Sequence, residues 1–208
     1  MNMNNKILFL IIATALVGIS WYTFQGTSKN DEGYIEKIEA ERFEKNQQFK
    51  ISEESPLTNE QKEHFTSLSY FPVAEKYKVK GEFYKNSKEQ IVKMAITDGS
   101  QRAYSVFGNV HLHLEGKELN LTVYRPVKED TEYLFIPFYD LTSADLTYGG
   151  GRYVEPELID PGTLIIDFNQ AYNPYCAYNH TYRCPIPPQE NNLQVSVLAG
   201  EKNPDFVK

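Results

Sequence analysis

The sequence predicts a mainly β protein of the α+β class. We expect an antiparallel sheet of about eight strands, curled into a barrel or a sandwich, with one or two N-terminal helices. From Tyr77 onward apolar residues alternate with polar ones, and this period of two is typical of strands with one buried face. The chain of 208 residues also contains 15 Tyr and 12 Phe, whose flat rings fit the half-buried surface of a sheet.

Two segments ahead of the strands are expected to be helical. Residues 31–49 are rich in strong helix formers and leave a wide charged face to solvent. A second, short helix is expected to begin at Thr58, because the sequence from Thr58 to Gln61 matches a capping box and Pro56 ends the segment before it. We place the end of this helix near Leu68.

The predicted strands follow one another at short spacing. Alternation predicts strands at 79–83 and 92–96, and Asp98-Gly99 predicts a tight turn before a strand at 101–107. Segments 110–114 and 119–123 flank a turn and are expected to pair as a hairpin. Further strands are expected at 133–138, 163–168 and 193–198.

A hydrophobic segment precedes the predicted domain. Residues 7–24 carry no charge, and at about 1.5 Å per residue such a helix would span most of a hydrocarbon core roughly 30 Å thick. The aromatic residues at its end favour an uncleaved membrane anchor. The alternative is a signal peptide cleaved near 18–20, which would leave a secreted or periplasmic protein. Lys6 before the segment and acidic residues after it favour an extracytoplasmic domain in both cases.

These observations divide the chain into three expected parts. Residues 1–28 form the anchor or signal segment, 29–76 a helical extension, and 77–208 the β-rich domain. The formal charge of −7, without any cluster of Lys and Arg, argues against nonspecific nucleic-acid binding. The expected partners are therefore a membrane and a small or envelope-derived ligand, and no nucleic acid.

Residues 138–200 differ in composition from the predicted strands before them and carry three motifs. We refer to residues 138–200 as the signature segment. The motifs read YGGGRY at 148–153, DFNQAYNPYCAY at 167–178 and CPIPPQEN at 184–191. In these motifs the chain resembles the domain of unknown function 1684 family, a bacterial and archaeal group of about this length. The resemblance is looser upstream. It implies no activity, no cofactor and no catalytic residue.

A ligand site is expected within the signature segment. The run 149–152 can form an amide-lined hollow beside a guanidinium, which suits a phosphate or a carboxylate. It lacks the GK[ST] ending of a nucleotide-binding loop. The alternative is a turn that requires positive φ, with the asparagines shaping loops. The candidate ligand-binding residues are Gly149, Gly150, Gly151, Arg152, Tyr153, Asp167, Asn169, Tyr172, Asn173, Glu190 and Asn191.

Both cysteines of the chain, Cys176 and Cys184, lie in the signature segment. In an exported domain such a pair favours a disulfide, which would contribute about 2–3 kcal/mol by closing a short loop. In one alternative, His180 between them completes a Cys-x3-His-x3-Cys zinc site, although no fourth ligand is evident. In another, one cysteine is a nucleophile activated by His180 and oriented by Glu190 or Asp167.

A second pair of possible metal ligands is His111 and His113, which lie two residues apart and therefore share one face of a predicted strand. The opposite face carries Val110, Leu112 and Leu114. We therefore interpret the two histidines as the solvated side of a hairpin.

Three functions remain open. The favoured one is a membrane-tethered domain that binds a small or polymeric, anionic or polar ligand at the signature segment. The alternatives are a hydrolase that uses a cysteine or Asp167 near His180, and a structural module of the cell envelope. Whether the protein is an enzyme does not follow from the sequence, and no cofactor is expected unless zinc binds.

Overall fold

The computed structural model describes residues 32–127 and 133–205. The predicted anchor at 7–24 lies outside these residues, as does residue 31 of the predicted first helix. The chain divides into two compact units, 1–40 and 41–208. Residues 32–40 of the first unit are helical, and the second unit begins with helical residues 41–51. Within the described residues, no helix has the length and hydropathy needed to span a membrane.

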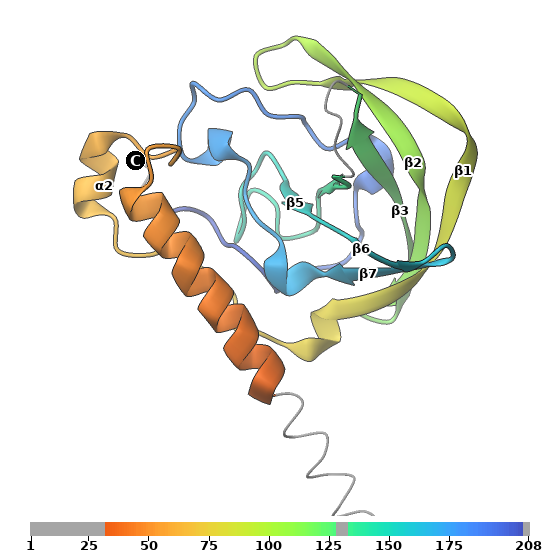
Figure 1. The fold of residues 1–208 in the computed structure, drawn as a ribbon, viewed down its shortest axis with the longest axis horizontal. Coiled ribbons are helices and arrows are strands. Elements are labelled where there is room, and N and C mark those ends of the chain that lie inside the picture. Colours follow the sequence, from red (N-terminus) through yellow and green to blue (C-terminus); the bar gives the residue numbers. More distant parts are fainter. Residues whose placement is uncertain (1–31, 128–132, 206–208) are drawn as a thin grey trace, which may run out of the picture. The chain divides into compact units, whose positions relative to one another are not determined.

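The second unit is built on an antiparallel sheet of five strands, which Figure 1 shows as a curved layer. Its order is β3 (Lys117–Pro126), β2 (Gln101–Leu114), β1 (Lys78–Ala95), β7 (Thr163–Asp167) and β6 (Glu157–Asp160). The predicted α+β class is confirmed. Because β3 and β6 are edge strands, this sheet is not a closed barrel.

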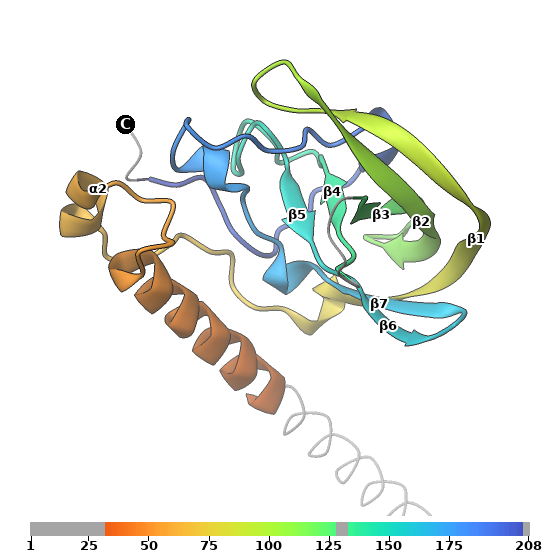
Figure 2. The same ribbon diagram turned by 45° about the horizontal axis from the view of Figure 1, so that its top comes forward.

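A second, small sheet pairs β4 (Ile136–Phe138) with β5 (Arg152–Val154). Figures 1 and 2 both place it on the inner side of the curved sheet. The main core lies between the two layers. It joins Phe83, Val110 and Leu164 of the large sheet to Phe138 and Val154 of the small one. Full burial of each such side chain stabilises the fold by about 1.5–3 kcal/mol.

The hairpins form where the alternation and the turn residues predict them. The strands expected at 79–83 and 92–96 are the two ends of β1, whose pairing with β2 is interrupted between Lys85 and Gln90. Gly99 has φ 82° in the first turn. Glu115 and Gly116 have φ 50° and 74° between β2 and β3, as a type I′ turn requires at both central positions.

Helix α2 (Asn59–His64) begins at the predicted cap. The Gln61 amide donates to Thr58 Oγ1 at 3.2 Å, and the Thr58 amide donates to Gln61 Oε1 at 2.8 Å. The helix ends four residues before the predicted end at Leu68, because Phe65 adopts an extended conformation and turns into a small core with Leu68 and Phe49. Four 3-10 turns are also present in the described residues: η1 (Glu75–Tyr77), η2 (Phe168–Gln170), η3 (Tyr175–Ala177) and η4 (Gln189–Asn191).

Two predicted strands differ from the structure. The strand expected at 133–138 is reduced to β4, and the segment 193–198 forms no strand although its side chains alternate between buried and exposed. The segment pairs only briefly, in parallel with residues 139–141: Tyr139 and Asn192 form an isolated bridge, and the Leu141 amide donates to the Val195 carbonyl at 3.0 Å. The Leu193 amide donates to the Tyr139 carbonyl at 2.8 Å, and the Val197 amide donates to the Asp140 carboxylate at 2.7 Å.

The side chain of Asn191 joins the two sheets. Its Nδ2 donates to the carbonyls of Thr122 and Pro137, both at 2.9 Å, and its Oδ1 accepts from the Thr122 amide at 2.7 Å. Asn191 is fully buried, so no water replaces these bonds. One amide side chain therefore holds the C-terminal half of β3 beside β4.

We expect Asn191→Ala to lower the free energy of unfolding by about 3 kcal/mol or more, since each buried polar group left unpaired is unfavourable by roughly 1–3 kcal/mol. Denaturant unfolding monitored by tyrosine fluorescence measures this change. The matched control is Asn192→Ala, whose exposed side chain should change stability by less than about 0.5 kcal/mol. Equal effects of the two variants would contradict the assigned role of Asn191.

Candidate ligand-binding site

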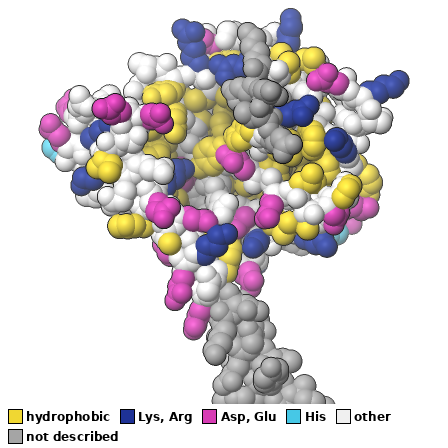
Figure 3. Space-filling model, in the orientation of Figure 1, with side chains coloured by type: hydrophobic (Ala, Val, Ile, Leu, Met, Phe, Trp, Pro, Cys, Tyr) yellow, Lys and Arg dark blue, Asp and Glu magenta, His cyan; other side chains and the backbone are white. Residues whose placement is uncertain are grey.

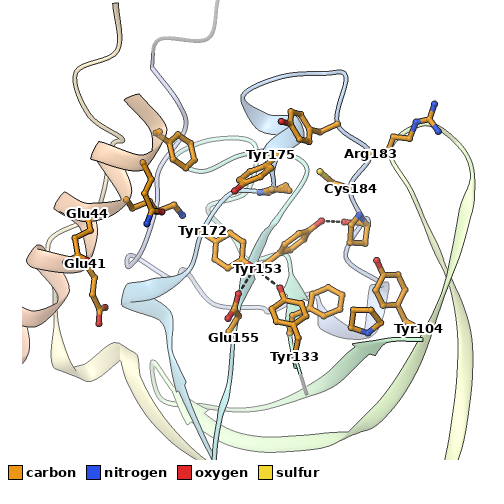
Figure 4. A pocket seen from close by; sticks show the side chains of 18 residues that line it. Glu41, Glu44, Tyr104, Tyr133, Tyr153, Glu155, Tyr172, Tyr175, Arg183 and Cys184 are labelled. Atoms are coloured by element: carbon orange, nitrogen blue, oxygen red, sulfur yellow. Dashed lines mark hydrogen bonds between the residues drawn. The ribbon is translucent and has the colours of Figure 1, made fainter. Parts of the chain in front are cut away.

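A cavity of about 620 Å³ opens in the second unit, within the size range of small-molecule sites. Figure 3 shows hydrophobic side chains gathered in this hollow, and Figure 4 shows the residues that line it. We name it the tyrosine cavity after its most frequent lining residue: Tyr104, Tyr133, Tyr153, Tyr172, Tyr175 and Tyr182. These rings come from β2, β5, the segment before β4 and the signature segment.

The tyrosine hydroxyls form a short chain of hydrogen bonds on one wall (Figure 4). Tyr172 donates to Glu155 Oε1 at 3.1 Å, and the hydroxyls of Tyr133 and Tyr172 are 2.9 Å apart. Because the single proton of Tyr172 goes to Glu155, Tyr133 is the donor of the second bond. Burial raises the pKa of both hydroxyls above its ordinary value, so both remain protonated at neutral pH.

The two cations of the tyrosine cavity are already paired. Lys45 Nζ lies 2.7 Å from Glu201 Oε1 and 4.8 Å from the centre of the Tyr172 ring, while Arg183 Nε lies 3.2 Å from Asp98 Oδ2. Three glutamates, at positions 41, 44 and 155, also line the wall. The tyrosine cavity therefore offers rings and hydroxyl groups, with no excess of positive charge.

A second hollow of about 470 Å³ adjoins the tyrosine cavity, because Tyr133 and Glu155 line both. We name it the basic hollow. Two cations converge there on one aromatic ring: Lys85 Nζ lies 4.9 Å and Arg125 Cζ 5.7 Å from the centre of the Phe107 ring. Both distances are within the range of cation–π attraction.

Arg152, the predicted anion-binding residue, lies in neither hollow. It is 1% exposed, and its guanidinium donates to the carbonyls of Val197 (3.0 Å), Ala199 and Glu201 (3.1 Å), with Asp140 Oδ2 at 3.6 Å. The anion-binding role of Arg152 is therefore not supported, because its charge is compensated inside the fold. The alternative for the preceding glycines is observed at Gly151, where φ is 83° and an added Cβ would lie 2.8 Å from the Phe138 carbonyl.

Most of the other candidate residues also have structural partners. Asn169 bonds to both backbone groups of Ala74, Asp167 accepts from the Asn169 amide at 3.1 Å, and Glu190 accepts from the Tyr124 hydroxyl at 2.7 Å. Asn173 donates to the Lys202 carbonyl at 2.8 Å, and Asn191 joins the sheets. Of the predicted ligand-binding residues, Tyr153 and Tyr172 line the tyrosine cavity.

Sequence reasoning missed most of the residues that line the hollows. Tyr104, Tyr133, Lys85 and Arg125 come from strands or from the segment before β4, outside the signature motifs. The high tyrosine content is the available signal, but by itself it indicates only a preference for sheet.

Cys176 and Cys184 are both buried and carry free thiols, so the predicted disulfide is absent from this structure. The two residues are adjacent: the Cys176 amide donates to Cys184 Sγ at 3.3 Å. His180 is exposed, and among the described residues no group of three or more His, Cys, Asp and Glu side chains is placed to hold a metal ion. The zinc alternative is therefore not supported. His111 and His113 are exposed on β2, as the solvated-face interpretation predicts.

Over residues 63–202 the chain matches the family described as "Protein of unknown function (DUF1684)", and it belongs to this family. It is also similar to the uncharacterized protein from gene locus rrnAC0354 of Haloarcula marismortui, known from a solution NMR structure. The two are 32% identical, with a TM-score of 0.66, and the match covers 84% of this chain and 96% of that one. No curated protein matches the chain.

We expect Arg152→Met to lower the free energy of unfolding by about 3–5 kcal/mol, because it leaves the Asp140 carboxylate buried without its ion-pair partner. Denaturant unfolding measures the loss. Arg183→Met is the matched control: the Arg183 side chain is 71% exposed, and the change should be within about 0.5 kcal/mol. A fully stable Arg152→Met variant would contradict the structural role and would restore anion binding as the function of this residue.

Proposed function

We propose that this protein binds a small molecule that carries a ring and an anionic group. The ring occupies the tyrosine cavity, and the anionic group contacts Lys85 and Arg125 in the basic hollow. The observation that carries the proposal is the shared wall of the two hollows, formed by Tyr133 and Glu155. An aromatic space and a pair of cations are thereby within reach of one ligand.

The walls of the tyrosine cavity favour a ring. Stacked and edge-to-face contacts between rings are worth about 0.5–1.5 kcal/mol each beyond the area that they bury. Several rings here already contact one another in this way, as Tyr153 and Tyr172 do at 5.8 Å, so the wall is held in place before a ligand arrives. Tyr175 is 44% exposed and presents ring surface to an incoming molecule.

The basic hollow favours an anion. Lys85 and Arg125 both lie near the Phe107 ring and line the same hollow, so their like charges repel each other. An anion between them removes this repulsion, and a guanidinium can bond a carboxylate or a phosphate with two parallel hydrogen bonds. Glu155 lines both hollows, so the anionic group is expected to bind on the side of the basic hollow that carries Lys85 and Arg125.

Binding is favoured over hydrolysis by the contacts of the predicted catalytic residues. Asp167 caps η2 and Glu190 bonds Tyr124, while His180 is exposed. None of these three lines the tyrosine cavity or the basic hollow. Cys184 does line the tyrosine cavity, but the histidine predicted to activate it for hydrolysis does not.

We expect 4-hydroxybenzoate to bind and 4-hydroxybenzamide, which has the same ring without the charge, to bind at least about 10-fold more weakly. Isothermal titration calorimetry measures both. Arg125→Ala should weaken the binding of 4-hydroxybenzoate by a similar factor, and Lys88→Ala, on an exposed part of β1, is the control with no expected change.

The contact with the ligand's ring is tested by Tyr175→Ala, which should weaken the binding of 4-hydroxybenzoate. Tyr84→Ala removes a 50% exposed ring outside both hollows and should leave the binding unchanged. Equal affinity for the acid and the amide would overturn the anionic part of the proposal. If no ring-bearing acid binds, glucuronate included, the binding function itself is wrong.

We also propose that residues 7–24 hold the protein at a membrane, with the β-rich domain on the extracytoplasmic side. The support is the length of the uncharged run, with Lys6 before it and acidic residues after it.

We expect the full-length chain to remain in the membrane pellet after alkaline carbonate extraction and to be digested by protease added to spheroplasts. Leu16→Arg should reduce membrane retention, since a cation at the centre of a span is unfavourable by about 2.5–3.5 kcal/mol. Recovery of a shortened soluble chain would instead support a cleaved signal, and a cytoplasmic chain would contradict both.

A further inference from the structure

Cys176 and Cys184 form a pair that the rest of the structure holds rigidly in place. Cys176 lies in η3 (Tyr175–Ala177). Cys184 is fixed to the turn between β1 and β2, because its amide donates to Thr97 Oγ1 at 3.1 Å and its carbonyl accepts from the Thr97 amide at 3.0 Å. The Cys176 amide then donates to Cys184 Sγ at 3.3 Å, which places the two cysteines side by side.

Both thiols are buried, but only one of them lines the tyrosine cavity. Cys184 lines the tyrosine cavity, and Figure 4 shows its sulfur at the cavity wall. Cys176 is buried behind it and does not line the cavity; its Sγ lies 3.9 Å from the Tyr148 hydroxyl. A reagent that enters the cavity therefore meets Cys184 first.

The two thiols also differ in acidity. The hydrogen bond from the Cys176 thiol, with support from the Cys176 amide and the positive charge of Arg102, lowers the pKa of Cys184 to about 7. The same bond and burial raise the pKa of Cys176. Tyr148, Tyr153 and Tyr175 also lie beside the pair, and burial raises the pKa of all three, so they are neutral where Cys184 ionises. A thiolate is the reactive form of cysteine, which makes Cys184 the nucleophile of the pair.

We infer that Cys176 and Cys184 form a redox-active dithiol that reacts with small-molecule disulfides entering the tyrosine cavity. Cys184 is the attacking thiol and Cys176 the resolving thiol. This inference goes beyond the proposed binding function and does not depend on it. The dithiol is the reduced state of the pair, and the disulfide expected from the sequence is its oxidised state.

The reaction has two steps and balances without a further reactant. The Cys184 thiolate attacks one sulfur of the small disulfide, whose S–S bond breaks, and the leaving thiolate takes up the proton that Cys184 had lost. Cys176 then loses its proton and attacks Cys184 Sγ, which breaks the mixed disulfide and releases the second small thiol, protonated. The protein dithiol is oxidised to a Cys176–Cys184 disulfide, and one small disulfide is reduced to two thiols.

The test uses the full chain in detergent, reduced and then freed of reductant, with oxidised glutathione as the probe. Intact mass should show the loss of two hydrogens in the wild-type protein, and peptide mapping should locate the new bond between Cys176 and Cys184. Cys176→Ser should stop at one glutathione on Cys184. Cys184→Ser should react at least about 10-fold more slowly than Cys176→Ser at pH 7.

A second measurement needs no substitution and therefore does not depend on the stability of the variants. Iodoacetamide in limiting amount should alkylate Cys184 before Cys176 in the native wild-type protein. The rate should rise with pH through a midpoint near the pKa of Cys184, about 7, and below the ordinary cysteine value of about 8.5. If neither thiol reacts until the protein is unfolded in urea, or if Cys176 reacts first, the inference is wrong.

Discussion

The signature segment depends on the ion pair and the hydrogen bonds of the buried Arg152 guanidinium. A charge removed from water is strongly unfavourable unless it is paired and fully hydrogen-bonded. Here the two terminal nitrogens face the Asp140 carboxylate and three carbonyls between residues 197 and 201, while the buried Nε has no hydrogen-bond partner among the described residues. The Asp140 carboxylate in turn accepts hydrogen bonds from the Val197 amide and the Thr142 hydroxyl. These bonds and a brief parallel pairing with residues 139–141 hold segment 193–198 in place, so it alternates like a strand although it belongs to neither sheet.

Elsewhere in the second unit, buried amide side chains also form hydrogen bonds to backbone groups. Asn191 bonds the backbone of β3 and of Pro137, and Asn169 bonds both polar groups of Ala74. In each case one side chain supplies a donor and an acceptor to backbone groups that have no ladder partner. Many polar residues of the signature segment therefore stabilise the fold and do not face a ligand site. The candidate functional groups lie in the two hollows. The tyrosine cavity is lined by tyrosines and one thiol, and the basic hollow beyond Tyr133 contains two cations.

The sequence predicts local structure well where the signal is local. The Thr58 cap, the 115–118 turn and the alternation of β1 to β3 depend on residues close in sequence, and all are observed. The residue at which α2 ends and the absence of a strand at 193–198 depend on contacts with residues far along the chain. A local sequence pattern therefore cannot predict them. The same reason limits the site. Gly151 and Arg152 look like an anion loop in sequence, but the carbonyls of 197–201 determine where the guanidinium points. Tyr104 on β2 and Tyr133 before β4 join the cavity only because these segments pack beside the signature segment.

The distance in sequence between Arg152 and its acceptors has a consequence for synthesis. A ribosome releases the chain from its N-terminal side, so Arg152 emerges well before the carbonyls of 197–201 that will surround it. Until then the guanidinium has no compensation inside a core and must stay hydrated. The small sheet that contains Arg152 cannot close over it. The hairpins of β1 to β3 are complete in sequence earlier, but the native core must wait for translation of residue 201. Folding of this domain therefore requires synthesis through residue 201, and truncation short of that position removes partners of the buried Arg152 charge.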